Sequence, residues 1–133
     1  MILTKNLIKY VKSLQYVKFR QKYNKFIAEG PKICAEFLDA QSHKIEYIFH
    51  TANLDPVLTQ KLDKQRDKTI NCNDKEFNSI SSLKSPNKIL MVLEQNVTSF
   101  PSDYEQVGWA IYCDRIQDPG NMGTILRLAD WFG

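Results

Sequence analysis

The residues best suited to chemistry lie near the end of the chain, in residues 118–132. Pro119 and Gly120 predict a sharp turn, and Asn121 follows where a side chain can cap the next helix. The first backbone N–H groups of such a helix, together with its positive end, form a seat for an anion. Arg127, one to two turns further along, can clamp a phosphate bidentately. The pattern is compatible with a site that acts on a phosphate-bearing substrate.

The same residues also suit an ordinary helix without a site. Asn is a common N-cap residue, and a single Arg on a helix is usually a solvated charge. Several apolar side chains fall roughly on one helical face, as core residues do: Ile125, Leu128, Ala129 and Phe132. Spacing alone therefore leaves both interpretations open.

Other kinds of site find little support. Cys34, Cys72 and Cys113 lie far apart without C-x-x-C spacing, so we expect neither a disulfide framework nor a zinc site, but reduced thiols of a cytoplasmic protein. His43 and His50 have no second ligand at metal-binding spacing. No apolar run approaches the roughly 20 residues that a bilayer requires.

Basic charge is concentrated at the start of the chain. Residues 1–95 hold 16 Lys and Arg against 10 Asp and Glu, whereas residues 96–133 hold two against five. Residues 1–28 carry seven basic side chains and no acidic one. This asymmetry indicates two units, of which the first faces an anionic partner.

Aromatic and basic residues alternate over residues 16–25, a pattern typical of RNA binding. Cations of this kind contact phosphates, and exposed rings stack on unpaired bases. Alternatively, Phe19 and Tyr23 pack into the core and the lysines only solvate the surface. The candidate RNA-binding residues are Lys18, Arg20, Lys22 and Lys25, joined by Lys32.

The elements that position these residues alternate between helix and strand. Apolar residues at helical spacing predict one amphipathic helix over residues 4–18, with Thr4 as its N-cap. The alternation predicts a layered α/β domain with a mostly parallel sheet. Strands are expected at residues 25–28, 45–49, 69–72 and 89–93, and helices from Pro31, over residues 56–62 and after Asn73 or Asp74.

Composition divides the chain into three parts. Residues 1–95 form the first domain, whose continuous apolar run at 89–93 predicts a strand covered on both faces. Residues 96–106 are polar and predict a linker. Residues 107–133 begin a second domain with a strand at 109–113 and a loop that leads into the helix from about Asn121.

The run D-P-G-N-M-G-T-I-L-R-L-A-D-W-F-G over residues 118–133, preceded by W-A-I-Y-C-D-R-I-Q, resembles the first signature motif of the SpoU (TrmH-like) family. The resemblance implies S-adenosylmethionine-dependent methylation of ribose 2′-hydroxyls in ribosomal or transfer RNA, on a knotted SPOUT-type α/β fold. It also implies that Asn121 positions the substrate and that Arg127 binds the target phosphate and helps to activate the hydroxyl. Because arginine is hard to deprotonate, we favour phosphate-assisted activation over direct proton removal.

The first domain is similar to the substrate-binding domain of that family, a small fold of the kind seen in RNA-binding ribosomal proteins. Asn87-Lys88 departs from the usual Gln-Gly. The matching residues are Arg20, Phe26, Glu29, Gly30, Phe77, Ser85 and Pro86.

The second and third motifs of the family, which form the knot and hold the methyl donor, lie further along the chain. We therefore expect this chain to be the N-terminal part of such an enzyme, able to bind RNA but inactive alone and without a cofactor of its own. The complete enzyme is expected to be a homodimer through the knot. The fragment is expected to be a monomer, or a weak dimer through Ile125, Leu128 and Phe132. A stand-alone RNA-binding module and a protein-interaction domain remain as alternatives.

Overall fold

Contacts divide the chain of the computed structural model into two units, Met1–Val97 and Thr98–Gly133. The structure describes residues 2–96 and 110–132. Most of the predicted linker, residues 97–106, lies outside the described residues.

Unit 1 is built on a four-stranded sheet of order β1-β4-β2-β3. β4 (Ile89–Glu94) runs antiparallel to both β1 (Lys25–Glu29) and β2 (Ile45–His50), and only β3 (Thr69–Asn71) is parallel to its neighbour β2. The prediction of a mostly parallel sheet is therefore wrong. The segment between β3 and β4 stays at the end of the sheet where β3 finishes. β4 therefore starts from that end and runs in the direction opposite to β3.

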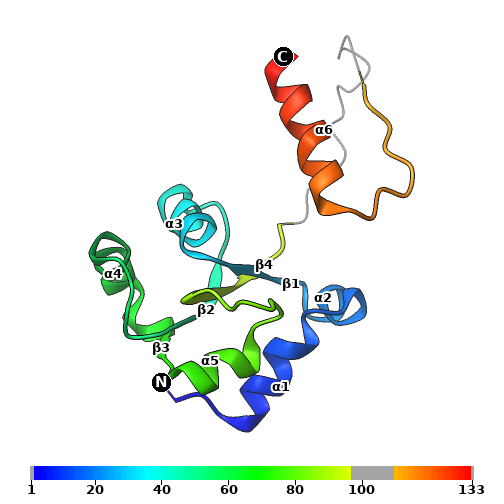
Figure 1. Ribbon diagram of the computed structural model, residues 1–133. Coiled ribbons are helices and arrows are strands. Elements are labelled where there is room, and N and C mark those ends of the chain that lie inside the picture. The colour runs from blue at the N-terminus through cyan, green and yellow to red at the C-terminus, as the bar shows by residue number, and fades with distance from the viewer. Residues whose placement is uncertain (1, 97–109, 133) are drawn as a thin grey trace. The chain divides into compact units, whose positions relative to one another are not determined.

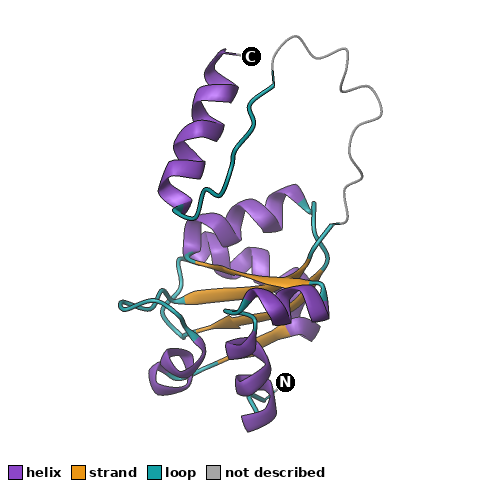
Figure 2. Cartoon of the chain, turned by 90° about the vertical axis from the view of Figure 1, so that its right-hand side faces the viewer, coloured by secondary structure: helices purple, strands orange, loops and turns teal. Residues whose placement is uncertain are grey.

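Helices cover both faces of the sheet, which makes a three-layered α/β unit (Figures 1 and 2). Leu90 and Val92 of β4 pack with α1 (Lys5–Ser13) and α5 (Asp74–Ile80). The alternate residues of β4 pack on the other face, against α3 (Pro31–Ala40) and α4 (Pro56–Leu62), which η1 (Asp63–Lys68) follows. The α/β class and the strand covered on both faces are confirmed.

The predicted helix over residues 4–18 is two helices in the structure. Thr4 caps the first, since its Oγ1 accepts a hydrogen bond from the backbone N–H of Leu7 at 3.2 Å. The chain turns after α1, and α2 (Val17–Tyr23) begins anew. The turn is held by Arg20, whose Nη1 donates to the carbonyl oxygens of Leu14 at 3.2 Å and Gln15 at 2.8 Å. The spacing of apolar residues does not predict this contact, which runs from the second helix back to the end of the first.

Unit 2 contains α6 (Pro119–Phe132) after a segment without regular secondary structure. Residues 110–113 form no strand, contrary to prediction, and residue 109 lies outside the described residues. A strand requires a neighbour for its backbone hydrogen bonds, and residues 110–132 offer none. Among the described residues, no helix combines the length and apolar character needed to cross a membrane.

Candidate nucleic-acid interface

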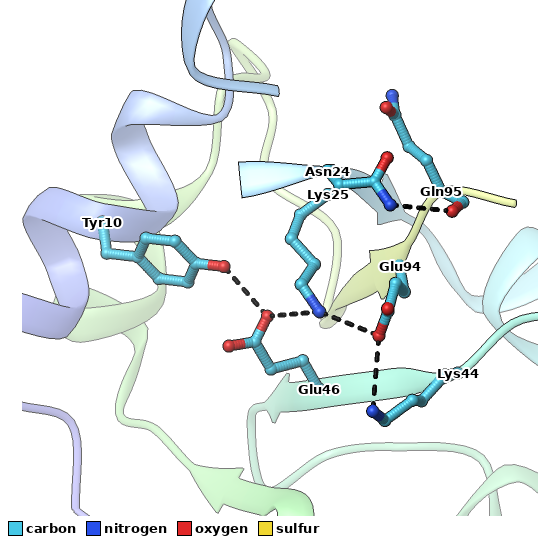
Figure 3. A network of polar contacts seen from close by, with 7 residues as sticks. All are labelled: Tyr10, Asn24, Lys25, Lys44, Glu46, Glu94 and Gln95. Carbon is cyan, nitrogen blue, oxygen red and sulfur yellow. Dashed lines mark hydrogen bonds and ion pairs between the residues drawn. The ribbon is translucent and has the colours of Figure 1, made fainter. Parts of the chain in front are cut away.

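Lys25, a predicted RNA-binding residue, lies in a polar network that links α1, β1, β2 and β4 (Figure 3). Its Nζ lies 3.4 Å from Glu46 Oε2 and 3.1 Å from Glu94 Oε2. Tyr10 donates its hydroxyl to Glu46 Oε2 at 2.9 Å, and Lys44 lies 3.5 Å from Glu94. The Lys25 side chain is only 17% exposed, whereas that of Lys44 is 78% exposed. The charge of Lys25 is therefore directed to carboxylates of the protein itself.

The network shifts the pKa values of its members. Burial and the hydrogen bond to Glu46 raise the pKa of Tyr10 well above its ordinary value of 10.0. Burial alone would lower the pKa of Lys25, but the interactions with Glu94 and Glu46 outweigh it and raise that pKa. The hydrogen bond from Lys25 and its charge lower the pKa of Glu94. At neutral pH the Lys25–Glu94 ion pair is therefore fully charged.

The aromatic residues of α2 pack against neighbouring rings and also remain partly exposed, so they fit both the core role and the RNA-binding role considered for them. Phe19 and Tyr23 stack with ring centroids 6.2 Å apart, and Tyr23 meets Tyr10 edge-on at 5.2 Å. Tyr23 nevertheless remains 38% exposed. Lys18 lies over the Phe19 ring at 5.9 Å and Lys22 over the Tyr23 ring at 5.3 Å. Both lysines are exposed, so α2 presents cations beside partly accessible rings.

A second row of cations follows α1. Lys5, Lys9 and Lys12 fall within about 60° of one another around the helix, on the side opposite the buried Val11. All three are exposed, and none takes part in an ion pair within the part of the chain that the structure describes. Their spacing was visible in the sequence, but it marks a solvated helix face as readily as a binding surface. Among the predicted residues, Lys32 is likewise exposed, in the first turn of α3.

Glu29 and Gly30 have structural roles at the end of β1. Glu29 Oε1 accepts hydrogen bonds from Ser81 Oγ at 2.7 Å and from the backbone N–H of Asn87 at 3.1 Å, so one carboxylate fixes both ends of the loop before β4. Its Oε2 is buried and has no hydrogen-bond partner within the described residues. Gly30 has a φ of 125°, a conformation that favours glycine.

The predicted catalytic residues both lie on α6, but they point in different directions. Asn121 lines a surface hollow of about 540 Å³, beside Thr124 and the loop that precedes the helix. Arg127 does not line it, because six residues along a helix place two side chains about 120° apart. Asp118, rather than Asn121, caps the helix: its Oδ1 accepts from the backbone N–H of Asn121 at 2.7 Å. Among the apolar residues of α6, Phe132 is 82% exposed.

Residues 5–91, from the start of α1 into β4, match the family model of the MRM3-like substrate binding domain. The chain belongs to this family. The MRM3-like substrate binding domain therefore covers nearly all of unit 1, and the resemblance to SpoU-type RNA methyltransferases is confirmed.

Two curated relatives agree with this assignment, and each match covers 84% of the chain. One is rRNA methyltransferase 3, mitochondrial, from Mus musculus, 28% identical over 117 residues. The other is rRNA methyltransferase 3A, mitochondrial, from Danio rerio, 31% identical over 117 residues. The chain spans only 28% and 26% of their lengths, with the MRM3-like domain making up most of the shared part.

Solved structures share the fold. A putative RNA methyltransferase of the TrmH family from Porphyromonas gingivalis matches with a TM-score of 0.74 and 28% identity, over 100% of this chain and 50% of that chain. A structure described as an RNA 2′-O ribose methyltransferase matches with a TM-score of 0.65 over 100% of this chain and 52% of that one. At 19% identity, this second likeness concerns the fold alone.

Proposed function

We propose that this chain is the N-terminal part of an S-adenosylmethionine-dependent ribose 2′-O-methyltransferase that acts on ribosomal or transfer RNA. The observation that carries the proposal is the match of residues 5–91 to a substrate binding domain whose relatives are named rRNA methyltransferases. In this proposal, unit 1 holds the RNA while the remainder of the enzyme performs the transfer.

The exposed cations of α1, α2 and α3 are the groups through which unit 1 would contact RNA. Lys18 and Lys22 combine charge with neighbouring rings, which suits phosphates next to unpaired bases. Lys25 supports this surface instead, because its charged group is bonded to carboxylates of the protein. Arg20 also supports it through Nη1, which holds the turn between α1 and α2. We therefore assign affinity chiefly to Lys18, Lys22 and Lys32, and to the α1 row Lys5, Lys9 and Lys12.

The described residues of unit 2 do not suffice to hold S-adenosylmethionine. They form one helix and a segment without regular secondary structure, with an open hollow beside Asn121 and no sheet behind it. We therefore propose that this chain does not methylate RNA alone. Calorimetric titration with S-adenosylmethionine should show no saturable binding; micromolar affinity would overturn this part of the proposal. Asn121 and Arg127 remain proposed catalytic residues of the complete enzyme.

The RNA-binding proposal is tested with two matched double variants. Lys18→Gln with Lys22→Gln should weaken binding to a hairpin RNA about tenfold and reduce the salt slope by about 2, since two phosphate contacts are lost. Lys64→Gln with Lys75→Gln makes the same charge change at exposed lysines of η1 and α5. Fluorescence anisotropy at several salt concentrations measures both. Equal losses in the two double variants would show that α2 is not a preferred contact surface.

A further inference from the structure

A hollow of about 500 Å³ lies along the edge strand β1, where the turn between α1 and α2 and the loop before β4 line it. Its volume is within the range of sites that hold small organic groups, about 300–1,000 Å³. Apolar and polar side chains both line it: Gln15, Arg20, Phe26, Ile27, Glu29, Ser82 and Leu83. None of its polar residues except Arg20 was among the predicted RNA-binding residues.

Glu29 gives the hollow a fixed acceptor. The hydrogen bonds from Ser81 and Asn87 to Oε1 hold the carboxylate in one orientation. They leave Oε2 buried without a donor among the described residues. A buried carboxylate oxygen without a donor is unfavourable, and Oε2 is covered by neighbouring atoms in the structure. A ligand N–H or O–H gains a charge-assisted hydrogen bond to it when the side chains that cover it move aside.

Arg20 gives the same hollow fixed donors. Its Nη1 is occupied by the carbonyl oxygens of Leu14 and Gln15, which immobilises the guanidinium. Its Nε and Nη2 have no partner within the described residues and together form a donor fork. A fixed fork loses little side-chain entropy when it binds two acceptors.

We propose that this hollow receives one unstacked nucleobase of the bound RNA, hydrogen-bonded to Glu29 and Arg20 and packed against Ile27 and Leu83. The inference rests on the proposed RNA-binding function and adds a base-reading subsite to it. Leu83 is 45% exposed, which leaves an apolar surface at the rim for a base to contact.

A nucleobase fits this hollow better than a phosphate does. A phosphate would be drawn to Arg20 but repelled by the carboxylate of Glu29. The edge of a base carries donors and acceptors side by side, so it can satisfy an acceptor and a donor fork together. The apolar residues of the hollow would also remain uncovered by a phosphate, whereas the face of a base covers them.

The test compares two variants with the same change of charge in the complete 133-residue chain. Glu29→Gln keeps an Oε1 that can accept from Ser81 and Asn87, but replaces the free acceptor by an amide donor. Glu36→Gln neutralises an exposed carboxylate of α3 outside the hollow. Electrostatics alone would tighten RNA binding slightly and equally in both. The probes are a hairpin RNA with an unpaired loop and a blunt duplex of the same stem.

We expect Glu29→Gln to bind the hairpin about tenfold more weakly than Glu36→Gln, because the loss of one charged hydrogen bond weakens binding by about that factor. Both variants should bind the duplex with equal affinity. Gln15→Ala, with Gln21→Ala as its exposed control outside the hollow, gives the same comparison if Glu29→Gln fails to fold. If folded hollow variants bind the hairpin as well as their controls, the subsite is overturned while RNA binding stands. If the unmodified chain binds neither probe, the proposed function fails and the subsite with it.

Discussion

The lysines of unit 1 differ in what their charge meets. Lys25 is enclosed by two carboxylates of the sheet, whereas Lys18 and Lys22 face solvent beside aromatic rings. Sequence alone does not separate these roles, because all three belong to one basic stretch. Only the pairing of β1 with β4, which places Lys25 beside Glu94, reveals the difference.

Lys25→Ala should destabilise unit 1, because it removes the cation that Glu46 and Glu94 share and leaves only the exposed Lys44 beside Glu94. We expect a Tm several degrees lower in thermal unfolding followed by circular dichroism. Lys44→Ala is the matched control, since Lys44 is 78% exposed and exposed ion pairs contribute little. A Tm change of the same size in both variants would contradict the structural role of Lys25.

The phenol of Tyr10 predicts a pH dependence at the alkaline side. Because its pKa is raised in the folded chain, the unfolded chain releases this proton first, and stability falls as the pH rises through about 10. Tyr10→Phe should cost about 1 kcal/mol near neutral pH through the lost hydrogen bond to Glu46. Urea unfolding at about pH 8 and about pH 11 should show the cost shrinking at the higher pH. Tyr16→Phe, which removes the same hydroxyl at an exposed tyrosine, is the matched control.

Among the helices of unit 1, α5 is the one whose N-terminus is closed by a capping box. Asn73 Oδ1 accepts from the backbone N–H of Glu76, and Glu76 Oε2 accepts from that of Asn73, each at 2.9 Å. Such a capping box satisfies two backbone donors that the helix leaves open. α5 brings Phe77 and Ile80 into the core below the sheet, so its start also fixes part of that core.

Asn73→Ala should therefore lower the free energy of unfolding by about 1 kcal/mol. Asn78→Ala, within the same helix at an exposed position, is the control and should change it by less than about 0.5 kcal/mol. Urea denaturation measures both values. An equal loss in the two variants would mean that the cap does not determine the effect, since the higher helix propensity of Ala cannot explain a loss of stability.

Local signals predicted most elements, and long-range contacts account for the errors. Pro31, Thr4 and Asn73 mark helix starts through their own chemistry, and the structure confirms them. The break after α1 depends on Arg20 reaching back to Leu14, which the apolar period does not encode. Strand direction likewise depends on where the loop before β4 returns the chain.

The candidate site was predictable to a similar extent. The sequence indicated the exposed Lys18, Lys22 and Lys32 through charge and aromatic spacing. It could not indicate the hollow beside Glu29, because residues 15, 29 and 83 are far apart in the chain and meet only through folding. It also could not show that Asp118 caps α6, since both Asp118 and Asn121 are good capping residues.

For the whole molecule, the two units differ in how their side chains are covered. Unit 1 has a closed core on each face of its sheet, and Cys34 and Cys72 are buried in these cores. Burial raises the pKa of the Cys34 thiol to about 12 and that of Cys72 to about 11. Cys113 of unit 2 is partly exposed.

A thiol reagent such as dithionitrobenzoate should therefore label Cys113 first at neutral pH. Cys34 and Cys72 should react only as fast as unit 1 opens, because the reagent needs an accessible thiolate. Cys113→Ser should remove the fast phase and leave the slow phase unchanged. Rapid labelling of three thiols in the folded chain would show that the cores of unit 1 are open to solvent.

The position of β4 has a consequence for how the protein is made. β4 is the last strand in the sequence but lies between β1 and β2 in the sheet. The strand that joins β1 to β2 is therefore missing until residues 89–94 have been synthesised. A nascent chain on the ribosome would therefore expose strand edges and both apolar sheet faces until that segment emerges from the exit tunnel. Translation of unit 1 is nearly complete before its four-stranded sheet can assemble, and chaperones that bind exposed apolar segments would have their longest access during that interval.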